Sequence, residues 1–334
     1  MSTLVLGHTD IRRILSFPEG IAAMDGALRR LAAGEARQPL RSLMAVPGRS
    51  GLLASMPAYL AEPETLGTKV LTVYSANREQ GRPSHQGVVA LFDPAHGEPL
   101  ALLDATALTE VRTACVSAVA TRALARADAG ELAILGSGAQ AEAHARAIPH
   151  VRPVRRIGLW DRRPERARAL ADRLARSQSI PVEVHPDAEA AVRSADVVCT
   201  TTASDAPVLL GEWLAPGTHV NAVGAVGPGL RELDTGALQR SRVFVDRRES
   251  ALAEAEEVRI PLAEGAFGPD HLRGELGEVL LGATPGRRSD AEITLFKSVG
   301  LAVEDLAAAR HAYDRALALG VGLRVDLAPG SGTA

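Results

Sequence analysis

The chain has 334 residues, of which 46% are apolar and 23% charged, a composition typical of a folded protein with room for two domains. Its 37 basic and 40 acidic residues give a net charge of −3 without a basic block, so nucleic acid is not an expected partner. The sequence shows no signal-peptide core and no apolar run long enough to span a membrane. Two cysteines among small apolar residues, Cys115 and Cys199, predict buried thiols in a reducing cytoplasm, and the nine histidines lack metal-ligand spacing, so no metal is expected.

The first third of the chain predicts a helix followed by a sheet. Ser16 and Pro18 are typical of the cap and first turn of a helix over about 18–34. Short Val- and Leu-rich segments separated by Gly, Pro and Asn then predict a mostly antiparallel sheet. Its strands are expected near 41–46, 51–56, 68–74, 87–92 and 99–104, and a helix crowded with small residues near 106–126.

The remainder alternates between strand and helix patterns, which predicts βαβ units and a parallel sheet. The expected strands are 131–136, 156–160, 182–184, 197–202, 218–223 and 242–246, with a helix near 164–176. After Asp246 the pattern loosens, and the segment 265–271 is expected to be a loop. A long helix over 300–319 should fold back onto the first domain, and the tail 327–334 is expected to be disordered.

One stretch of this alternating region predicts a bound dinucleotide. An apolar strand leads into Gly136, Gly138 and Ala141, spaced as G-x-G-x-x-A, and a helix pattern follows. Glycines permit the tight turn and the approach of a pyrophosphate, which the helix N-terminus attracts. We therefore expect the pyrophosphate to lie along Gly136, Ser137, Gly138, Ala139 and Gln140.

The choice between the two nicotinamide cofactors stays open at this point. Asp161 lies twenty residues after Ala141, where an acid accepts hydrogen bonds from the ribose 2′-hydroxyl and favours NAD(H). Arg162 and Arg163 follow it directly and could bind the 2′-phosphate of NADP(H), although solvated loop residues are the alternative reading. The preference is narrowly for NAD(H).

Several stretches taken together resemble the ornithine cyclodeaminase/mu-crystallin family. They include PLRSLMAVPGRSGLLASMPAYL, GTKVLTVYSAN, PSHQGVVALFDPAHGEPLALLDATALTEVRTACVSAVAT, LGSGAQAEAHARAI, HVNAVGAVGPGLRELD and ITLFKSVGLAVEDLAAA, and cover roughly 35–320. The resemblance implies an α/β protein in which a Rossmann-type doubly wound domain is inserted into a mixed α+β domain that binds substrate and dimerises. We expect the first domain to comprise 1–118 and 300–334, and the Rossmann domain 119–299.

Three cations outside the nucleotide domain are candidates for binding the substrate. Arg41, Lys69 and Arg112 each lie among apolar or small residues, and a buried cation needs an anionic partner. That partner could be an internal carboxylate such as Glu110 or Asp104. The resemblance implies instead that matching positions hold the carboxylate of the substrate, which would place the C=N carbon of a 2-imino acid for hydride transfer.

The chemistry of this reaction, the predicted sheet and the resemblance add further site residues. Lys69 is the leading candidate to handle the proton of the imine nitrogen, because desolvation can lower the pKa of a lysine. His85 is a second candidate, and a structural histidine is the alternative. Thr113, Val223 within 221–224 and Ser298 within 298–300 match positions near the cofactor. Thr200 and Thr201 follow the fourth strand of the domain at its ligand edge, or are simply hydrogen-bonded strand-end hydroxyls.

One departure from the family pattern bears on the reaction. Val226 stands where the cyclodeaminase branch has an aspartate that interacts with the amine of the substrate, and valine can do neither acid–base chemistry nor ion pairing. Asp234, in the ELD that follows, is expected to be structural. The leading hypothesis is a homodimeric NAD(P)H-dependent reductase of cyclic ketimines and other 2-imino acids. Ornithine cyclodeamination and cofactor binding without turnover, as in a crystallin, are the alternatives.

Overall fold

The computed structural model describes residues 2–49 and 51–327, and the chain divides into two compact units. Unit 1 comprises 1–112 and 301–334, and unit 2 comprises 113–300. Of the tail expected to be disordered, 328–334 lie outside the described residues. Among the described residues, no helix has the length and apolar character needed to cross a bilayer. In the same ranges no three His, Cys, Asp or Glu side chains gather as a metal site requires.

Unit 1 is built on one sheet, in which the order of the strands is β16-β1-β7-β6-β5-β4-β2 and β3 pairs with β4. All these pairings are antiparallel except that of β1 with β7. The five predicted strands correspond to β3–β7, so the mostly antiparallel sheet is confirmed. The strands are β1 (Thr3–Leu6), β2 (Ala36–Arg37), β3 (Ser42–Ala45), β4 (Gly51–Ala61), β5 (Glu64–Tyr74), β6 (His85–Phe92), β7 (Pro99–Asp104) and β16 (Leu323–Val325).

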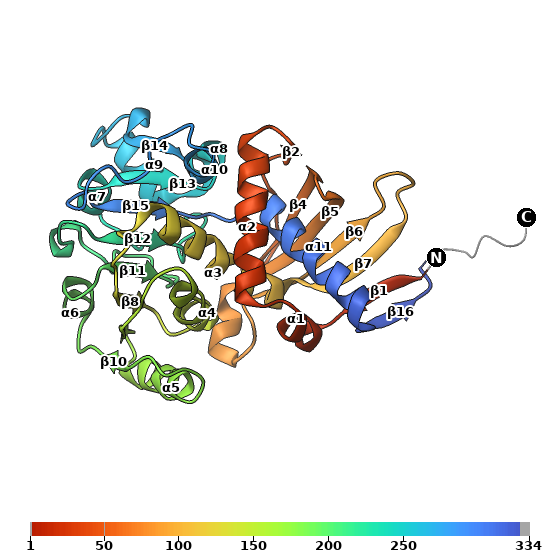
Figure 1. Ribbon diagram of the computed structural model, residues 1–334, viewed down its shortest axis with the longest axis horizontal. Coiled ribbons are helices and arrows are strands. Elements are labelled where there is room, and N and C mark those ends of the chain that lie inside the picture. The colour runs from red at the N-terminus through yellow and green to blue at the C-terminus, as the bar shows by residue number, and fades with distance from the viewer. Residues whose placement is uncertain (1, 50, 328–334) are drawn as a thin grey trace, which may run out of the picture. The chain divides into compact units, whose positions relative to one another are not determined.

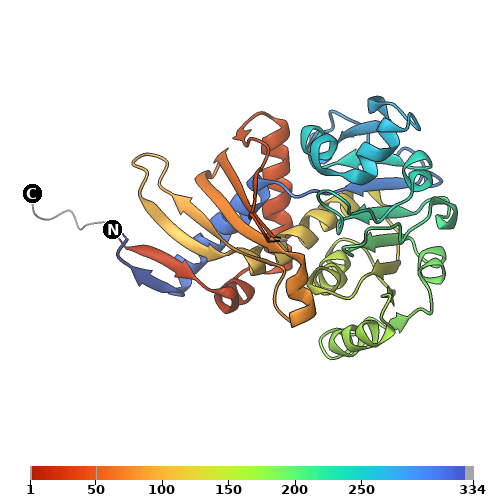
Figure 2. The same ribbon diagram turned by 180° about the vertical axis from the view of Figure 1, so that it is seen from behind.

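One face of this sheet is covered by helix α11 (Ala302–Leu319), with α2 (Phe17–Ala32) beside it (Figure 1). On β4, Ala54, Met56, Ala58 and Leu60 are buried, while the residues between them are half-buried or exposed. This period of two means that alternate side chains point at α11. The view from behind shows the other face of the sheet (Figure 2). The expected cap of α2 is confirmed, because Ser16 accepts a hydrogen bond from the Glu19 amide.

Unit 2 is built on an all-parallel sheet in the order β10-β9-β8-β11-β12-β15-β13-β14. The chain starts at β8, adds β9 and β10 on one side, then returns to add β11 and β12 on the other, which is the doubly wound order. This confirms the predicted Rossmann-type class. The strands are β8 (Glu131–Leu135), β9 (Arg156–Trp160), β10 (Val182–Val184), β11 (Val197–Thr200), β12 (His219–Ala222), β13 (Arg242–Val245), β14 (Leu272–Glu275) and β15 (Thr294–Lys297).

Two of these strands, β14 and β15, were not among the predicted elements. β15 inserts between β12 and β13, so the strand that follows β12 in sequence is not its neighbour in the sheet. The helices outside α2 and α11 are α1 (His8–Ile14), α3 (Ala105–Leu124), α4 (Ala139–Ala147), α5 (Pro164–Ala175), α6 (Ala188–Arg193), α7 (Thr235–Gln239), α8 (Arg248–Glu254), α9 (Glu256–Ala263) and α10 (Leu276–Leu280). Of these, α3 begins in unit 1 and ends in unit 2.

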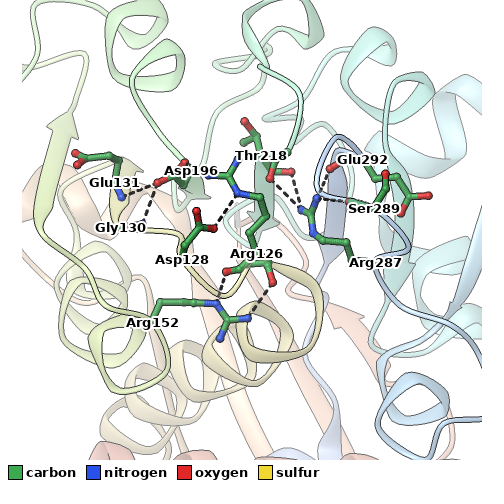
Figure 3. A network of polar contacts seen from close by, with 12 residues as sticks. Arg126, Asp128, Gly130, Glu131, Arg152, Asp196, Thr218, Arg287, Ser289 and Glu292 are labelled. Atoms are coloured by element: carbon green, nitrogen blue, oxygen red, sulfur yellow. Dashed lines mark hydrogen bonds and ion pairs between the residues drawn. The ribbon is translucent and has the colours of Figure 1, made fainter.

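Arginines satisfy the carbonyl groups at the C-terminal end of α3 (Figure 3). Arg152 donates to the carbonyls of Arg122, Ala125 and Arg126, and Arg287 donates to that of Leu124. The last carbonyls of a helix generally lack partners within it, and the negative end of the helix dipole favours cations. The cluster therefore fixes the end of α3 within unit 2.

Asp196 extends the same network to the start of β8 (Figure 3). One carboxylate oxygen accepts from the Arg126 guanidinium at 2.7 Å, and the other accepts from the amides of Gly130 and Glu131. The end of α3 and the strand that leads to the glycine-rich turn are thus held by one carboxylate.

Candidate functional site

The predicted cations Lys69 and Arg112 lie together in a buried ion-pair cluster of unit 1. The Lys69 ammonium is 2.7 Å from Asp305 Oδ2, and Arg112 donates through Nε to Asp305 Oδ1 at 2.9 Å. Arg112 also donates through Nη1 to Glu304 Oε2 at 2.7 Å. Both carboxylates are fully buried, and the two cations are at most 5% exposed. Asp305 thus bridges the two cations.

The fold explains why these residues meet. Lys69 pairs with Met56 on one side and Val89 on the other, both buried, so its side chain lies on the face of the sheet that α11 covers. Asp305 and Glu304 belong to the first turn of α11, where the helix dipole favours carboxylates. Removing one member of such a cluster leaves an uncompensated buried charge, at a cost of about 3–5 kcal/mol.

The surroundings of Lys69 bring its pKa closer to neutral pH. Burial, opposed by the charge of Asp305, lowers the pKa of Lys69 to about 8, and the nearby charges of Arg112 and Arg41 act in the same direction as burial. Burial also disfavours the charged form of Asp305, yet Arg112 and Lys69 together hold its pKa below the ordinary value. The cluster therefore combines an ammonium group of lowered pKa with a guanidinium that stays charged.

The alternative that these cations pair with an internal carboxylate is borne out, but the partners are not Asp104 or Glu110, the two examples considered from sequence. Asp104 pairs with His8 and accepts from the Ala107 amide, while Glu110 pairs with Arg12. The buried cations instead pair with Glu304 and Asp305. Local sequence patterns carry no signal for this pairing, because more than 190 residues separate the partners. The only available hint was two acids at the start of a helix expected to return to the first domain.

The remaining two candidates of unit 1 lie differently. Arg41 immediately precedes β3 and is close enough to Lys69 to lower its pKa. His85 starts β6 on an exposed position, and its Nδ1 contacts Ser84 Oγ at 3.1 Å. It is four residues from Val89, the partner of Lys69, which corresponds to about 13 Å along the strand. Unit 1 therefore brings Arg41, but not His85, near the ion-pair cluster.

In unit 2 the glycine-rich turn combines a tight backbone with open space at a helix N-terminus. Gly136 has φ +117°, and a Cβ there would lie 2.7 Å from Thr201 Oγ1, so only glycine fits. Gly138 is the N-cap of α4, and a Cβ there would meet nothing within 4 Å. Ala141 is fully buried, where its small side chain lets helix and strand pack closely. Open space at an exposed helix N-terminus fits a phosphate group.

Asp161 lies at the end of β9, next to this turn. Its carboxylate accepts from Ser137 Oγ at 2.6 Å and from the Arg163 amide at 2.9 Å. A carboxylate offers about four acceptor positions, so each oxygen retains capacity for a ribose hydroxyl. Arg162 is exposed, as are Gly138 and Ala139, while Ser137 and Gln140 are half-buried.

The other candidates of unit 2 lie at the carboxyl ends of its strands or on α3. Thr200 Oγ1 donates to Glu232 at 2.8 Å, and Thr201 Oγ1 donates to the Leu135 carbonyl at 3.0 Å, as expected of hydrogen-bonded strand-end hydroxyls. Ser298 Oγ donates to Asp246 Oδ2 at 3.4 Å. Val223 and Thr113 are both buried.

A buried carboxylate that was not predicted as a site residue lies at this edge of the sheet. Glu232 is fully buried and accepts hydrogen bonds from the segments that follow β11 and β12. Its neighbour in the ELD motif, Asp234, is structural as expected, because it caps α7 and also accepts from the Gly211 amide. The only sequence signal for Glu232 was an acid in a stretch otherwise rich in glycine and valine.

Comparison with known proteins places these features in a family. The ornithine cyclodeaminase/mu-crystallin family model matches residues 1–320. The chain belongs to this family. A Delta(1)-pyrroline-2-carboxylate reductase of Bacillus cereus is 38% identical over 97% of this chain and 99% of its own length.

Solved structures agree with this membership. The Delta(1)-pyrroline-2-carboxylate reductase of Thermococcus litoralis in complex with NADH and L-proline is 37% identical, with a TM-score of 0.95 over 97% of this chain and 100% of that one. An archaeal alanine dehydrogenase dimer with bound NAD is 34% identical, with a TM-score of 0.92 over 98% and 100% of the respective chains. The fold of this chain is therefore that of nicotinamide-dependent enzymes of the family.

Val226, the departure from the cyclodeaminase pattern, packs as a partly buried side chain against the hydrophobic core of unit 2. It can neither accept a proton nor pair with an ammonium group. The structure thus gives this position an apolar role.

Proposed function

We propose that this member of the family is an NAD(P)H-dependent reductase of 2-imino acids, with cyclic ketimines such as pyrroline-2-carboxylate as its first substrates. The single observation that carries the proposal is the buried cluster in which Lys69, with a pKa of about 8, shares Asp305 with Arg112. The names of the similar reductases support the same reaction class. The reverse reaction would be the oxidation of an amino acid.

The chemistry divides two tasks among the three cations. Reduction of a C=N bond adds a hydride to carbon and a proton to nitrogen, and NAD(P)H supplies the hydride when it is bound. Arg112 and Arg41 hold the substrate carboxylate through charge-assisted hydrogen bonds. Lys69 donates the proton to the imine nitrogen, since its pKa of about 8 leaves it largely protonated at pH 7 but able to release the proton.

On the cofactor side, Gly136–Gln140 hold the pyrophosphate and Asp161 accepts from the adenosine ribose. A carboxylate at that position repels a 2′-phosphate, which supports NAD(H) as the preferred cofactor and NADP(H) as the second. Thr113, Thr200, Thr201, Val223 and Ser298 complete the proposed cofactor-binding set. The buried thiols Cys115 and Cys199 accord with a reducing cytoplasm as the place of action.

We also propose that the chain acts as a homodimer that associates through the sheet of unit 1. Large apolar side chains are exposed along this sheet, at Leu43 and Met44 on β3, at Val88 on β6, and at Leu40 just before β3. Met44 and Val88 lie on the face of the sheet that points away from α11, and exposed apolar residues on such a face are typical of an association surface. The similar alanine dehydrogenase is described as a dimer.

Steady-state assays of NADH and NADPH oxidation with cyclic ketimines, and with pyruvate plus amines, test the proposed reaction. The expected result is turnover of at least one cyclic ketimine, with kcat/KM falling above about pH 8 as Lys69 loses its proton. No turnover of any imino or keto acid would contradict the proposal. Release of ammonia and proline from ornithine would replace it with cyclodeamination.

A double variant separates the role of Lys69 in catalysis from its role in the fold. Lys69→Met with Asp305→Asn removes an ammonium and a carboxylate together, so less buried charge is left unpaired than in a single variant. We expect NADH binding to persist while kcat/KM falls by about 100-fold or more, the scale of general acid catalysis. The matched control is Arg310→Met with Asp314→Asn, an exposed pair on the same α11, which should keep its activity.

A further inference from the structure

Glu232 connects two backbone segments of unit 2 that also meet directly, because the Val223 and Gly224 amides both donate to the Thr200 carbonyl. Its Oε1 accepts from the Thr202 amide at 2.5 Å and the Thr202 hydroxyl at 2.7 Å. Its Oε2 accepts from Thr200 Oγ1 at 2.8 Å, the Gly224 amide at 2.7 Å and the Ala225 amide at 3.2 Å. One carboxylate oxygen thus serves the segment after β11, and the other chiefly serves the segment after β12.

The close packing of these segments is a second, independent observation. A Cβ on Gly224 would lie 1.9 Å from the Thr202 carbonyl oxygen and 2.7 Å from Glu232 Oε1. A side chain at this position would therefore force the segments apart. The glycine and the glutamate together define one fixed spacing between 200–202 and 223–225.

A second layer holds Glu232 in place. The Glu232 amide donates to Glu257 Oε1 at 3.0 Å, and Glu257 Oε2 is 2.7 Å from the Lys297 ammonium. Lys297 in turn donates to the Ala225 carbonyl at 2.6 Å, which closes a ring of contacts. Burial and the charge of Glu257 raise the pKa of Glu232, while Lys297 opposes this effect. The ring fixes both the amide and the carbonyl of Ala225.

The position of these segments in the sheet indicates which part of a bound dinucleotide they would contact. β11 pairs with β8, which leads to the glycine-rich turn, and with β12 on its other side. Asp161 follows β9, which lies on the opposite side of β8. A dinucleotide whose pyrophosphate lies at the turn and whose adenosine ribose meets Asp161 must extend its nicotinamide half toward the ends of β11 and β12.

We propose that Glu232 is a positioning residue for the nicotinamide half of the cofactor, acting through the segments 200–202 and 223–225. The inference rests on the proposed function for the identity of the cofactor. Glutamate is required because both of its oxygens accept, whereas the amide of glutamine has one acceptor and an NH2 group that would face N–H donors. Glu232→Gln therefore keeps the size of the side chain but releases one of the two segments.

The test compares two ligands on the full-length Glu232→Gln variant. NADH contains the nicotinamide half, and ADP-ribose lacks it while keeping the adenosine and pyrophosphate. We expect the Kd of NADH to rise about tenfold, the effect of losing one charge-assisted hydrogen bond, and the Kd of ADP-ribose to stay within about twofold. Binding is measured by calorimetry, so the outcome does not depend on whether the chain reduces imines.

Asp234→Asn is the matched control for this experiment. It also removes one carboxylate two residues away, but Asp234 caps α7 and binds Gly211 rather than the two strand-end segments. It should lower the melting temperature and leave the ratio of the two Kd values unchanged. If Glu232→Gln raises the Kd of NADH and the Kd of ADP-ribose by the same factor, or changes neither, the inference is overturned.

Thr202→Val provides a second route if Glu232→Gln fails to fold. It removes one hydroxyl bond to Glu232 and keeps the amide bond, so a smaller loss confined to NADH is expected. Equal effects on NADH and ADP-ribose would again overturn the inference. If the wild-type chain reduces no imine, the proposed substrate class is refuted. A selective loss of NADH affinity in the variant would still support the role of Glu232.

Discussion

Two buried histidines of unit 2 make its stability depend on pH. His144 contacts the Gln140 carbonyl through Nδ1 and Ser117 Oγ through Nε2, and burial lowers its pKa from 6.5 to about 4. His219 contacts Thr294 and is also fully buried. Burial is the main reason why its pKa falls to about 3. Both side chains are therefore neutral in the folded protein at pH 7.

This neutrality predicts a loss of stability in mild acid. Between pH 6.5 and about 4 the unfolded chain binds a proton at His144 that the folded chain does not, so the free energy of unfolding decreases as the pH falls. In this window His144 lowers the free energy of unfolding by about 1.4 kcal/mol for each pH unit of acidification. Above pH 6.5 its stabilising contribution is fully retained. Urea unfolding of His144→Gln should show a shallower pH dependence in this window. His96→Gln, at an exposed position, should keep the wild-type slope.

A second prediction concerns the choice of cofactor at Asp161 and Arg162. If the exposed Arg162 contacts a 2′-phosphate, Arg162→Ala should raise the Kd of NADPH by about tenfold and leave that of NADH unchanged. Arg166→Ala, an exposed arginine on α5, is the control. If the Kd values of NADPH and NADH change equally, Arg162 does not bind the 2′-phosphate.

The chemistry of single residues could be predicted from sequence only in part. A buried cation among apolar residues must find an anion, and for Lys69 and Arg112 this expectation is confirmed. Which anion it finds depends on how distant segments pack, and local patterns carry no information about that. The roles of Asp305 and Glu232 therefore emerge only from the folded structure.

At the scale of elements, two aspartate caps offer a direct comparison. Asp187 accepts only from the Ala190 amide of α6, whereas Asp234 accepts from the Ala237 amide of α7 and from the buried amide of Gly211. Loss of a cap costs about 1 kcal/mol, and an unsatisfied buried amide adds about 1–3 kcal/mol. Chemical denaturation should thus show a larger loss for Asp234→Ala than for Asp187→Ala. Equal losses would mean that Gly211 finds another partner.

The elements that could be predicted share a clear periodicity or motif. Helix α2 has its cap and first-turn proline, and β8 precedes the glycine turn. By contrast, β14 has the sequence LRGE, which has no apolar run, and β15 lies in the region after Asp246 where the alternating pattern loosens. Both become strands because neighbouring strands supply their hydrogen bonds, a tertiary effect that overrides weak local propensity.

At the scale of the whole molecule, the proposed homodimer can be tested by charge. Met44→Lys with Val88→Lys places two cations on the exposed sheet of unit 1, and burying them in an interface is costly. Light scattering should therefore show a monomer in place of a dimer. Leu252→Lys, at an exposed apolar position on α8 of unit 2, should leave the mass unchanged. A dimer that survives the double substitution would place the interface elsewhere.

The discontinuity of unit 1 has a consequence for the order in which the protein is made. Every strand of its sheet except β16 has been synthesised once β7 is made, yet α11, which covers that sheet, leaves the ribosome only after all of unit 2. Until then Lys69 and Arg112 lack both of their carboxylates. A nascent chain that stops before residue 302 contains all of unit 2. Of the cation cluster it contains Lys69 and Arg112, but not the carboxylates of Glu304 and Asp305. The cluster on which the proposed catalysis depends is therefore among the last features of the molecule to form.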